Sequence, residues 1–170
     1  MIVGIDSMIL VYAGFVPLKP GKRAADFEDL CVRSKLLLHQ IERRKGTVLL
    51  PTIAISELLV PVPKAQQGEL IAALTKKFVC PPFDIMAAAI AADLWSRHKR
   101  LPQDQQYGSR QVLRADAMIV ASACAAGATD FYSHDGNCRA LASLVMTPHD
   151  LPTSDPEDMF LEGDIRRGDV

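Results

Sequence analysis

Several features that identify other classes of protein are missing from this chain. No apolar stretch reaches the roughly 18 to 20 residues that a membrane helix requires, so no membrane association is expected. The chain has four cysteines, but no two of them have the C-x-x-C spacing of a zinc site. We therefore expect reduced, mostly buried thiols in a cytoplasmic protein rather than a disulfide framework. The N-terminus lacks the basic-then-apolar layout of a secretory signal, and no internal repeat is present.

The composition is that of a folded domain. The chain has 170 residues, of which 49% are hydrophobic and 23% charged. A chain of this length can bury a full core, and this balance of residues does not indicate disorder. We therefore expect a single domain.

Short β-rich runs alternate with amphipathic segments along most of the chain. Strands are predicted near residues 2–5, 47–50, 78–83, 129–132 and 144–147. Helices are predicted over residues 8–15, 24–45, 52–59, 64–77, 84–100, 111–126 and 137–143, and a polar loop over 101–110. This alternation predicts an α/β fold, a three-layer α/β/α sandwich around a parallel sheet of four to five strands.

Charge is distributed unevenly although the net charge is only −1. Residues 150–170 contain seven acids against two arginines, which leaves 17 basic and 13 acidic residues in 1–149. The sequence therefore predicts a folded domain over residues 1–148 and a loose acidic C-terminal tail over 149–170. A moderately basic body of this kind can attract a polyanion.

Four carboxylates interrupt apolar surroundings at positions that propensity does not favour. Asp6 ends the first strand, and Glu57 lies one turn into the helix after the second strand. Asp116 interrupts an apolar helix, and Asp135 follows the fourth strand. Helix capping or a nearby arginine would explain any one of them, because a buried lone carboxylate needs a partner.

Taken together, the four acids predict a cation site. The carboxyl ends of parallel strands lie on one edge of a sheet, and helices that follow those strands start at the same edge. The arginines nearest in sequence, Arg114 and Arg139, are predicted to be surface residues. The expected counterion is therefore a hard divalent cation, Mg²⁺ or Mn²⁺, which prefers oxygen ligands.

The segments that carry these acids resemble a known family. GIDSMILVY, SELLV, RADAMIVASA and FYSHDGNCRAL, in this order, resemble the PIN domain, and most closely the VapC-type toxin ribonucleases of bacterial toxin–antitoxin systems. The resemblance covers residues 1–148 and implies a Mg²⁺-dependent endoribonuclease that cleaves single-stranded RNA with a metal-activated water. The acids that it implies as catalytic residues and metal ligands are Asp6, Glu57, Asp116 and Asp135.

Other residues match the family less completely. Ser7 and Ser133 correspond to hydroxyl residues that accompany the first and last acids of the family. Asn137 stands where many members have a further acid, so a second metal ion is expected to bind weakly. His134, an exposed loop residue beside Asp135, is interpreted as incidental.

The resemblance also implies partners: RNA, a second copy in a homodimer and a small antitoxin protein. Basic side chains beside the site would hold RNA phosphates without reading the sequence. The candidates for this contact are Lys22, Arg23, Lys99, Arg100, Arg110 and Arg114.

Three alternatives remain open at this point. The chain could be a catalytically weak or inactive PIN-fold module that binds RNA or a protein, as Asn137 suggests. It could be a PIN nuclease of RNA processing rather than a toxin. A phosphoryl-transfer enzyme with Asp6 as nucleophile is disfavoured, because Met8 stands where such enzymes usually place a second Asp.

The charge asymmetry predicts that the tail competes with RNA for the basic body. Deleting residues 150–170 should tighten the binding of single-stranded RNA at low salt, because seven acids no longer oppose the phosphates. Fluorescence anisotropy with a labelled RNA at low and high salt measures this effect. Equal or weaker affinity in the truncated protein would reject the prediction.

Overall fold

A four-stranded parallel sheet forms the centre of the fold, in the order β2-β1-β3-β4. The computed structural model describes residues 1–16, 26–100 and 110–153, without the side chains of residues 99 and 110–112. The strands are β1 (Ile2–Ile5), β2 (Thr47–Leu49), β3 (Asp130–Tyr132) and β4 (Thr147–His149). The helices are α1 (Ser7–Tyr12), α2 (Phe27–Arg43), α3 (Thr52–Leu59), α4 (Lys64–Lys77), α5 (Ile85–Lys99), α6 (Arg110–Ala125) and α7 (Gly136–Ala142).

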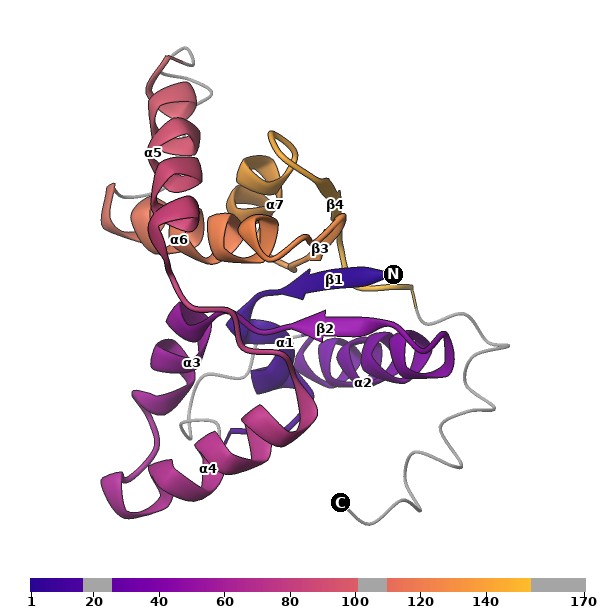
Figure 1. The fold of residues 1–170 in the computed structure, drawn as a ribbon. Helices are drawn as coiled ribbons and strands as arrows, with labels where there is room; N and C mark the ends of the chain where they lie inside the picture. Colours follow the sequence, from indigo (N-terminus) through magenta and orange to yellow (C-terminus); the bar gives the residue numbers. More distant parts are fainter. Residues whose placement is uncertain (17–25, 101–109, 154–170) are drawn as a thin grey trace.

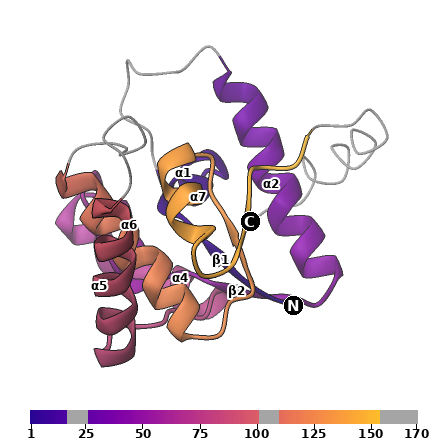
Figure 2. The ribbon, with the colours of Figure 1, turned by 90° about the horizontal axis from the view of Figure 1, so that it is seen from above.

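Helices cover both faces of the sheet. In Figure 1, α5, α6 and α7 lie to the left of β3 and β4, while α1, α2 and α4 lie below β2. Figure 2, which views the molecule from above, shows α6 and α7 crossing in front of the strands. This arrangement confirms the predicted three-layer sandwich around a parallel sheet.

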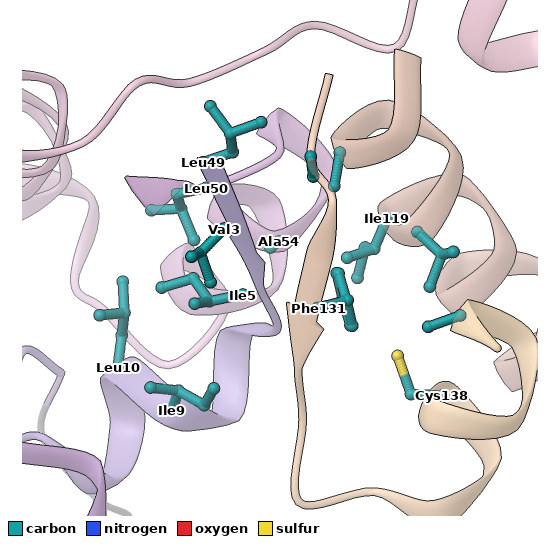
Figure 3. Close-up of a cluster of buried hydrophobic side chains, with 14 of the residues drawn as sticks. Val3, Ile5, Ile9, Leu10, Leu49, Leu50, Ala54, Ile119, Phe131 and Cys138 are labelled. Carbon is teal, nitrogen blue, oxygen red and sulfur yellow. The ribbon is translucent and has the colours of Figure 1, made fainter. Parts of the chain in front are cut away.

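The central strand β1 divides the core between the two layers of helices. Val3 and Ile5 are fully buried and point toward Leu10 of α1 (Figure 3). Gly4 pairs with Phe131 in the neighbouring strand β3, and a side chain at this position would face α6. A Cβ atom at Gly4 would lie 2.7 Å from the Cβ of Ala123 in α6 and 2.7 Å from Cδ2 of Phe131. The missing side chain therefore lets α6 pack directly against the sheet.

Two predicted strands are wrong. Within residues 78–83, only Val79 pairs with the sheet, through an isolated bridge to Leu49. Pro81 and Pro82 have no N–H group, so this segment cannot extend a ladder. The strand predicted at 144–147 begins only at residue 147, because Leu144–Met146 form the turn that closes α7 with backbone hydrogen bonds to Leu141 and Ala142.

Smaller differences have local causes. The first helix ends at Tyr12 rather than at residue 15, and Gly14 follows it with φ of 88°. All four cysteines are free, as predicted. Only Cys138 is buried and the other three are partly exposed, so the prediction of mostly buried thiols holds for one of the four. Most of the loop predicted over 101–110 lies outside the described residues. Within the described part of the chain, no helix has the length and apolar character needed to span a membrane.

The chain past residue 148 begins as part of the fold. His149 belongs to β4, and Leu151 is only 3% exposed. The domain division at residue 148 stays a prediction, and residues 154–170 lie outside the described ranges. A truncation that tests the acidic tail alone should therefore keep residues 150–153 and remove 154–170.

The close approach of α6 to β1 predicts that Gly4→Ala destabilises the protein. The added methyl group must displace Ala123 or Phe131, and such overpacking typically costs about 1–3 kcal/mol. Gly68→Ala is the matched control, because Gly68 lies in α4 with no atom within 4 Å of an added Cβ. The control should gain up to about 1 kcal/mol from helix propensity. Urea unfolding of both variants measures the difference, and equal stability of Gly4→Ala and the wild type would contradict this packing argument.

Candidate active site

The four acids singled out in the sequence line one cavity at the carboxyl edge of the sheet. The cavity has a volume of about 260 Å³. Asp6 and Asp135 reach it from the ends of β1 and β3, while Glu57 and Asp116 reach it from α3 and α6. The rest of the lining is Ser7 and an apolar wall of Met8, Val11, Leu58 and Pro61. The structure therefore brings the four acids together as expected, and their roles in catalysis and metal binding stay predictions.

Asp6 is held by hydrogen bonds on both carboxylate oxygens. It is the N-cap of α1, where Oδ1 accepts a hydrogen bond from the backbone N–H of Met8 at 2.8 Å. Oδ2 accepts a hydrogen bond from the hydroxyl of Ser133 at 2.6 Å. The side chain is 7% exposed, so its orientation is fixed by the protein rather than by solvent.

Ser7 connects two of the acids. Its hydroxyl donates to Oε2 of Glu57 at 2.7 Å and lies 3.2 Å from Oδ1 of Asp6. The hydroxyl has one proton, so the shorter contact to Glu57 is the stronger hydrogen bond. Burial raises the pKa of Glu57; the hydrogen bond from Ser7 lowers it in part, and the negative charge of Asp6 raises it further.

Ser133 organises the loop that carries Asp135. Its buried hydroxyl accepts a hydrogen bond from the N–H of Asp135 at 3.0 Å while donating to Asp6. Asp135 is the N-cap of α7 and accepts from the N–H of Asn137 at 2.7 Å. Asn137 thus supports the loop through its backbone, and its side chain is not part of the cavity lining.

Asp116 differs from the other acids because one of its oxygens has no partner. Oδ2 is buried and makes no hydrogen bond. Burial, followed by the charges of Asp135, Asp6 and Glu57, raises the pKa of this carboxyl from an ordinary value of 3.8 to about 7. A buried, unpartnered carboxylate oxygen beside three other acids is a position that a cation would stabilise.

The chemistry of the cavity fits a hard divalent cation. All the charged groups that line it are carboxylates, the ligands that Mg²⁺ and Mn²⁺ prefer. Within the three described ranges, however, no group of three or more His, Cys, Asp or Glu side chains is already arranged to hold an ion. The carboxylates repel one another, and two of them accept hydrogen bonds from serine hydroxyls. A bound ion would therefore have to draw the carboxylates together.

Of the predicted RNA-binding cations, only Arg100 and Arg114 have side chains that the structure describes, and neither lines the cavity. Arg114 lies two residues before Asp116 on the same helix, so the two side chains point about 200° apart. Its guanidinium lies 5.6 Å from the centre of the Trp95 ring in α5. Arg100 is the C-cap residue of α5 and is not part of the lining. Lys22 and Arg23, and the side chains of Lys99 and Arg110, lie outside what the structure describes.

The structure gives partners to two residues near the site. Arg139, predicted at the surface, is 28% exposed and donates to the carbonyl of Ser133 at 2.8 Å. His134 is exposed as predicted, and its Nδ1 lies 3.0 Å from Oδ1 of Asp150. Asp150 was missed: it directly follows β4 at the same edge as Asp6 and Asp135, but the misplaced last strand concealed this signal.

Comparison with known proteins supports the fold. No family model matches the chain, and no curated protein matches its sequence. The structure resembles that of VapBC2 from Rickettsia felis bound to a DNA fragment from their promoter, with 14% identity and a TM-score of 0.55. That likeness covers 89% of this chain and 100% of the other. VapC20 of Mycobacterium tuberculosis, a toxin that cleaves the sarcin-ricin loop, has 14% identity, a TM-score of 0.49 and coverage of 81% and 93%.

The likeness to VapBC2 shows a VapC-like PIN-domain fold, as the sequence resemblance implied. The TM-score of the second structure is too low to add to this conclusion. At 14% identity the likeness establishes the fold and leaves activity open.

The raised pKa of Asp116 predicts an unusual pH dependence for the metal-free protein. Between pH 4 and pH 7 the folded state binds this proton more tightly than the unfolded state does. The free energy of unfolding should therefore fall as pH rises through this window and level off above it. Asp116→Asn should flatten the slope and raise the melting temperature at pH 8, where about 1 kcal/mol corresponds to about 2–4 °C.

The matched control is Asp93→Asn, which removes an exposed acid paired with Arg97 on α5. Thermal melts in EDTA from pH 4 to pH 8 provide the comparison. A lower melting temperature for Asp116→Asn at pH 8 would mean that this carboxylate stabilises the metal-free fold.

Proposed function

We propose that this protein is a Mg²⁺- or Mn²⁺-dependent endoribonuclease that cleaves single-stranded RNA and acts as the toxin of a toxin–antitoxin pair. The main support is the cavity in which four acids converge and Oδ2 of Asp116 has no partner. The likeness of the fold to VapBC2 supports the choice of a nuclease over other metal-dependent enzymes.

The acids of the cavity would have different roles in binding an ion. Asp6 is pre-oriented, because hydrogen bonds from Met8 and Ser133 fix its carboxylate before any ligand arrives. Asp116 offers an oxygen with no competing partner, so it is the principal ligand in this proposal. Glu57 and Asp135 complete the set, directly or through water.

A divalent cation held by these carboxylates would supply an activated water and would neutralise negative charge on the phosphate. The apolar wall of Met8, Val11, Leu58 and Pro61 borders the acids. A lower local dielectric strengthens the attraction between the carboxylates and a cation. Because the 2′-hydroxyl of RNA is not used, the products should have 5′-phosphate and 3′-hydroxyl ends.

The partners follow from the same assignment. As a VapC-like toxin, this protein would bind a small antitoxin, in keeping with the paired name of VapBC2, the similar structure. It would also form a homodimer and act in the cytoplasm. A reading frame for a short antitoxin immediately upstream would support the toxin role over RNA processing.

Two observations favour a second candidate, a PIN-fold module that binds RNA without cleaving it. Asn137 replaces a family acid, and no described group of three potential ligands is already arranged around an ion. The experiment below separates the two candidates.

Removing a charge from the cavity should abolish cleavage without unfolding the protein. Asp6→Asn and Asp116→Asn, and likewise Glu57→Gln, keep the shape of the side chain but weaken cation binding, so cleavage should fall by at least about 100-fold. Asp93→Asn, outside the cavity, should retain wild-type activity. A gel assay with end-labelled single-stranded RNA, with Mn²⁺ and with EDTA, measures cleavage, and thermal melts measure ion binding.

The wild type should melt at a higher temperature with Mn²⁺ than with EDTA, because an ion that binds only the folded state stabilises it. Cleavage that persists in EDTA, or in the cavity variants, would place the active centre elsewhere. RNA binding without cleavage under any metal condition would instead favour the inactive module.

A further inference from the structure

Asp150 lies where three parts of the fold meet beside the cavity. Its Oδ1 is 3.0 Å from Nδ1 of His134 in the loop before α7 and 4.0 Å from Nη2 of Arg33 in α2. Its Oδ2 is 3.3 Å from Nη1 of Arg139 in α7. The backbone N–H of Leu151 also donates to Oδ1, at 2.7 Å. The carboxylate therefore joins α2, α7 and the loop that carries two residues of the site.

Arg33 also binds the two residues that follow Asp150. Nε of Arg33 donates to the carbonyl of Pro152 at 2.7 Å, and Nη2 donates to the carbonyl of Leu151 at 2.8 Å. In Figure 2 the yellow segment that follows β4 passes between α7 and α2. This segment is thus a built part of the domain, although its acid belongs by composition to the tail.

An ion pair followed by hydrogen bonds links Asp150 to the cavity. The same Nη1 of Arg139 that approaches Asp150 donates to the backbone carbonyl of Ser133 at 2.8 Å. The hydroxyl of Ser133 in turn donates to Asp6 and accepts from the N–H of Asp135. The orientation of two of the four acids therefore depends on where this one serine is held.

We propose that Asp150 is a positioning residue of the cavity, which acts through Arg139 and His134 to fix the 133–135 loop. The partly buried guanidinium of Arg139 needs a carboxylate partner, and Asp150 keeps it over the Ser133 carbonyl. Without that partner the loop gains freedom, and carboxylates displaced by even a fraction of an ångström bind an ion less well. This inference rests on the proposed function in so far as the acids hold a metal ion.

The electrostatics of Asp150 agree with this role. Burial alone would raise its pKa, but hydrogen bonds from His134 and from the N–H of Leu151, together with the charge of Arg139, keep the pKa below its usual value. The group is therefore a carboxylate at neutral pH, as the contact with Arg139 requires.

The test compares Asp150→Asn with Asp29→Asn. Asp29 is another carboxylate paired with Arg33, at 3.4 Å, and lies in the first turn of α2. Three quantities are measured for the full chain: amide hydrogen exchange without metal, the Mn²⁺ affinity from thermal melts, and the rate of RNA cleavage. Asp150→Glu, which keeps the charge, tests for rescue.

In Asp150→Asn, the amides of Asp135 and Asn137 should exchange faster, while those of β1 and α6 are unchanged. The Mn²⁺ dissociation constant should rise by about 10-fold, and cleavage should fall by a similar factor, as is typical for residues that orient metal ligands. Asp29→Asn should match the wild type, and Asp150→Glu should recover part of both losses.

Unchanged exchange and Mn²⁺ affinity in Asp150→Asn would overturn the proposal, as would equal losses in Asp29→Asn. Faster exchange throughout the molecule would also overturn it, because the role would then be one of general stability. If the wild type binds Mn²⁺ but never cleaves RNA, the proposed function fails, while exchange and affinity still decide the role of Asp150. If the wild type does not bind Mn²⁺ at all, both proposals fail.

Discussion

Mutual repulsion among four carboxylates is the constraint around which the carboxyl edge of this sheet is built. Gathering these groups into about 260 Å³ costs free energy that hydrophobic burial elsewhere must offset. Two serine hydroxyls and two capping backbone amides reduce the cost by donating to Asp6, Glu57 and Asp135. No such donor reaches Oδ2 of Asp116, which is buried without a hydrogen-bond partner.

The four acids therefore differ in how firmly the protein defines them. Asp6 follows β1 directly and Asp135 follows β3 after two residues, and each is the N-cap of a helix. Glu57 and Asp116 lie within helices, where the backbone N–H groups are used by the helix itself. Burial is the main cause that raises the pKa of both carboxyls. The site combines two rigid carboxylates with two that are less well stabilised as anions.

The sequence was sufficient to predict the sandwich and the convergence of the acids, because both follow from where strands end in a parallel sheet. It was insufficient where a single backbone feature decides the outcome. Two prolines stop residues 78–83 from forming a strand, and a turn after α7 shifts β4 by three residues. That shift hid Asp150 among the acids of the tail. The sequence also did not predict the position of Arg114, because a residue close to Asp116 in sequence can lie on another face of α6.

The prolines at the two margins of the sheet have a consequence for how this protein can associate. β4 forms one margin of the sheet. The N–H of Thr147 and the carbonyl of His149 bond to the β3 side, so the backbone of the residue between them, Pro148, is directed outward. At the other margin, Val79 covers part of β2 and is followed by Pro81 and Pro82. A strand from another chain would find no N–H donor at these positions, which disfavours edge-to-edge aggregation. Association with another chain by lengthening the sheet is therefore disfavoured at these positions.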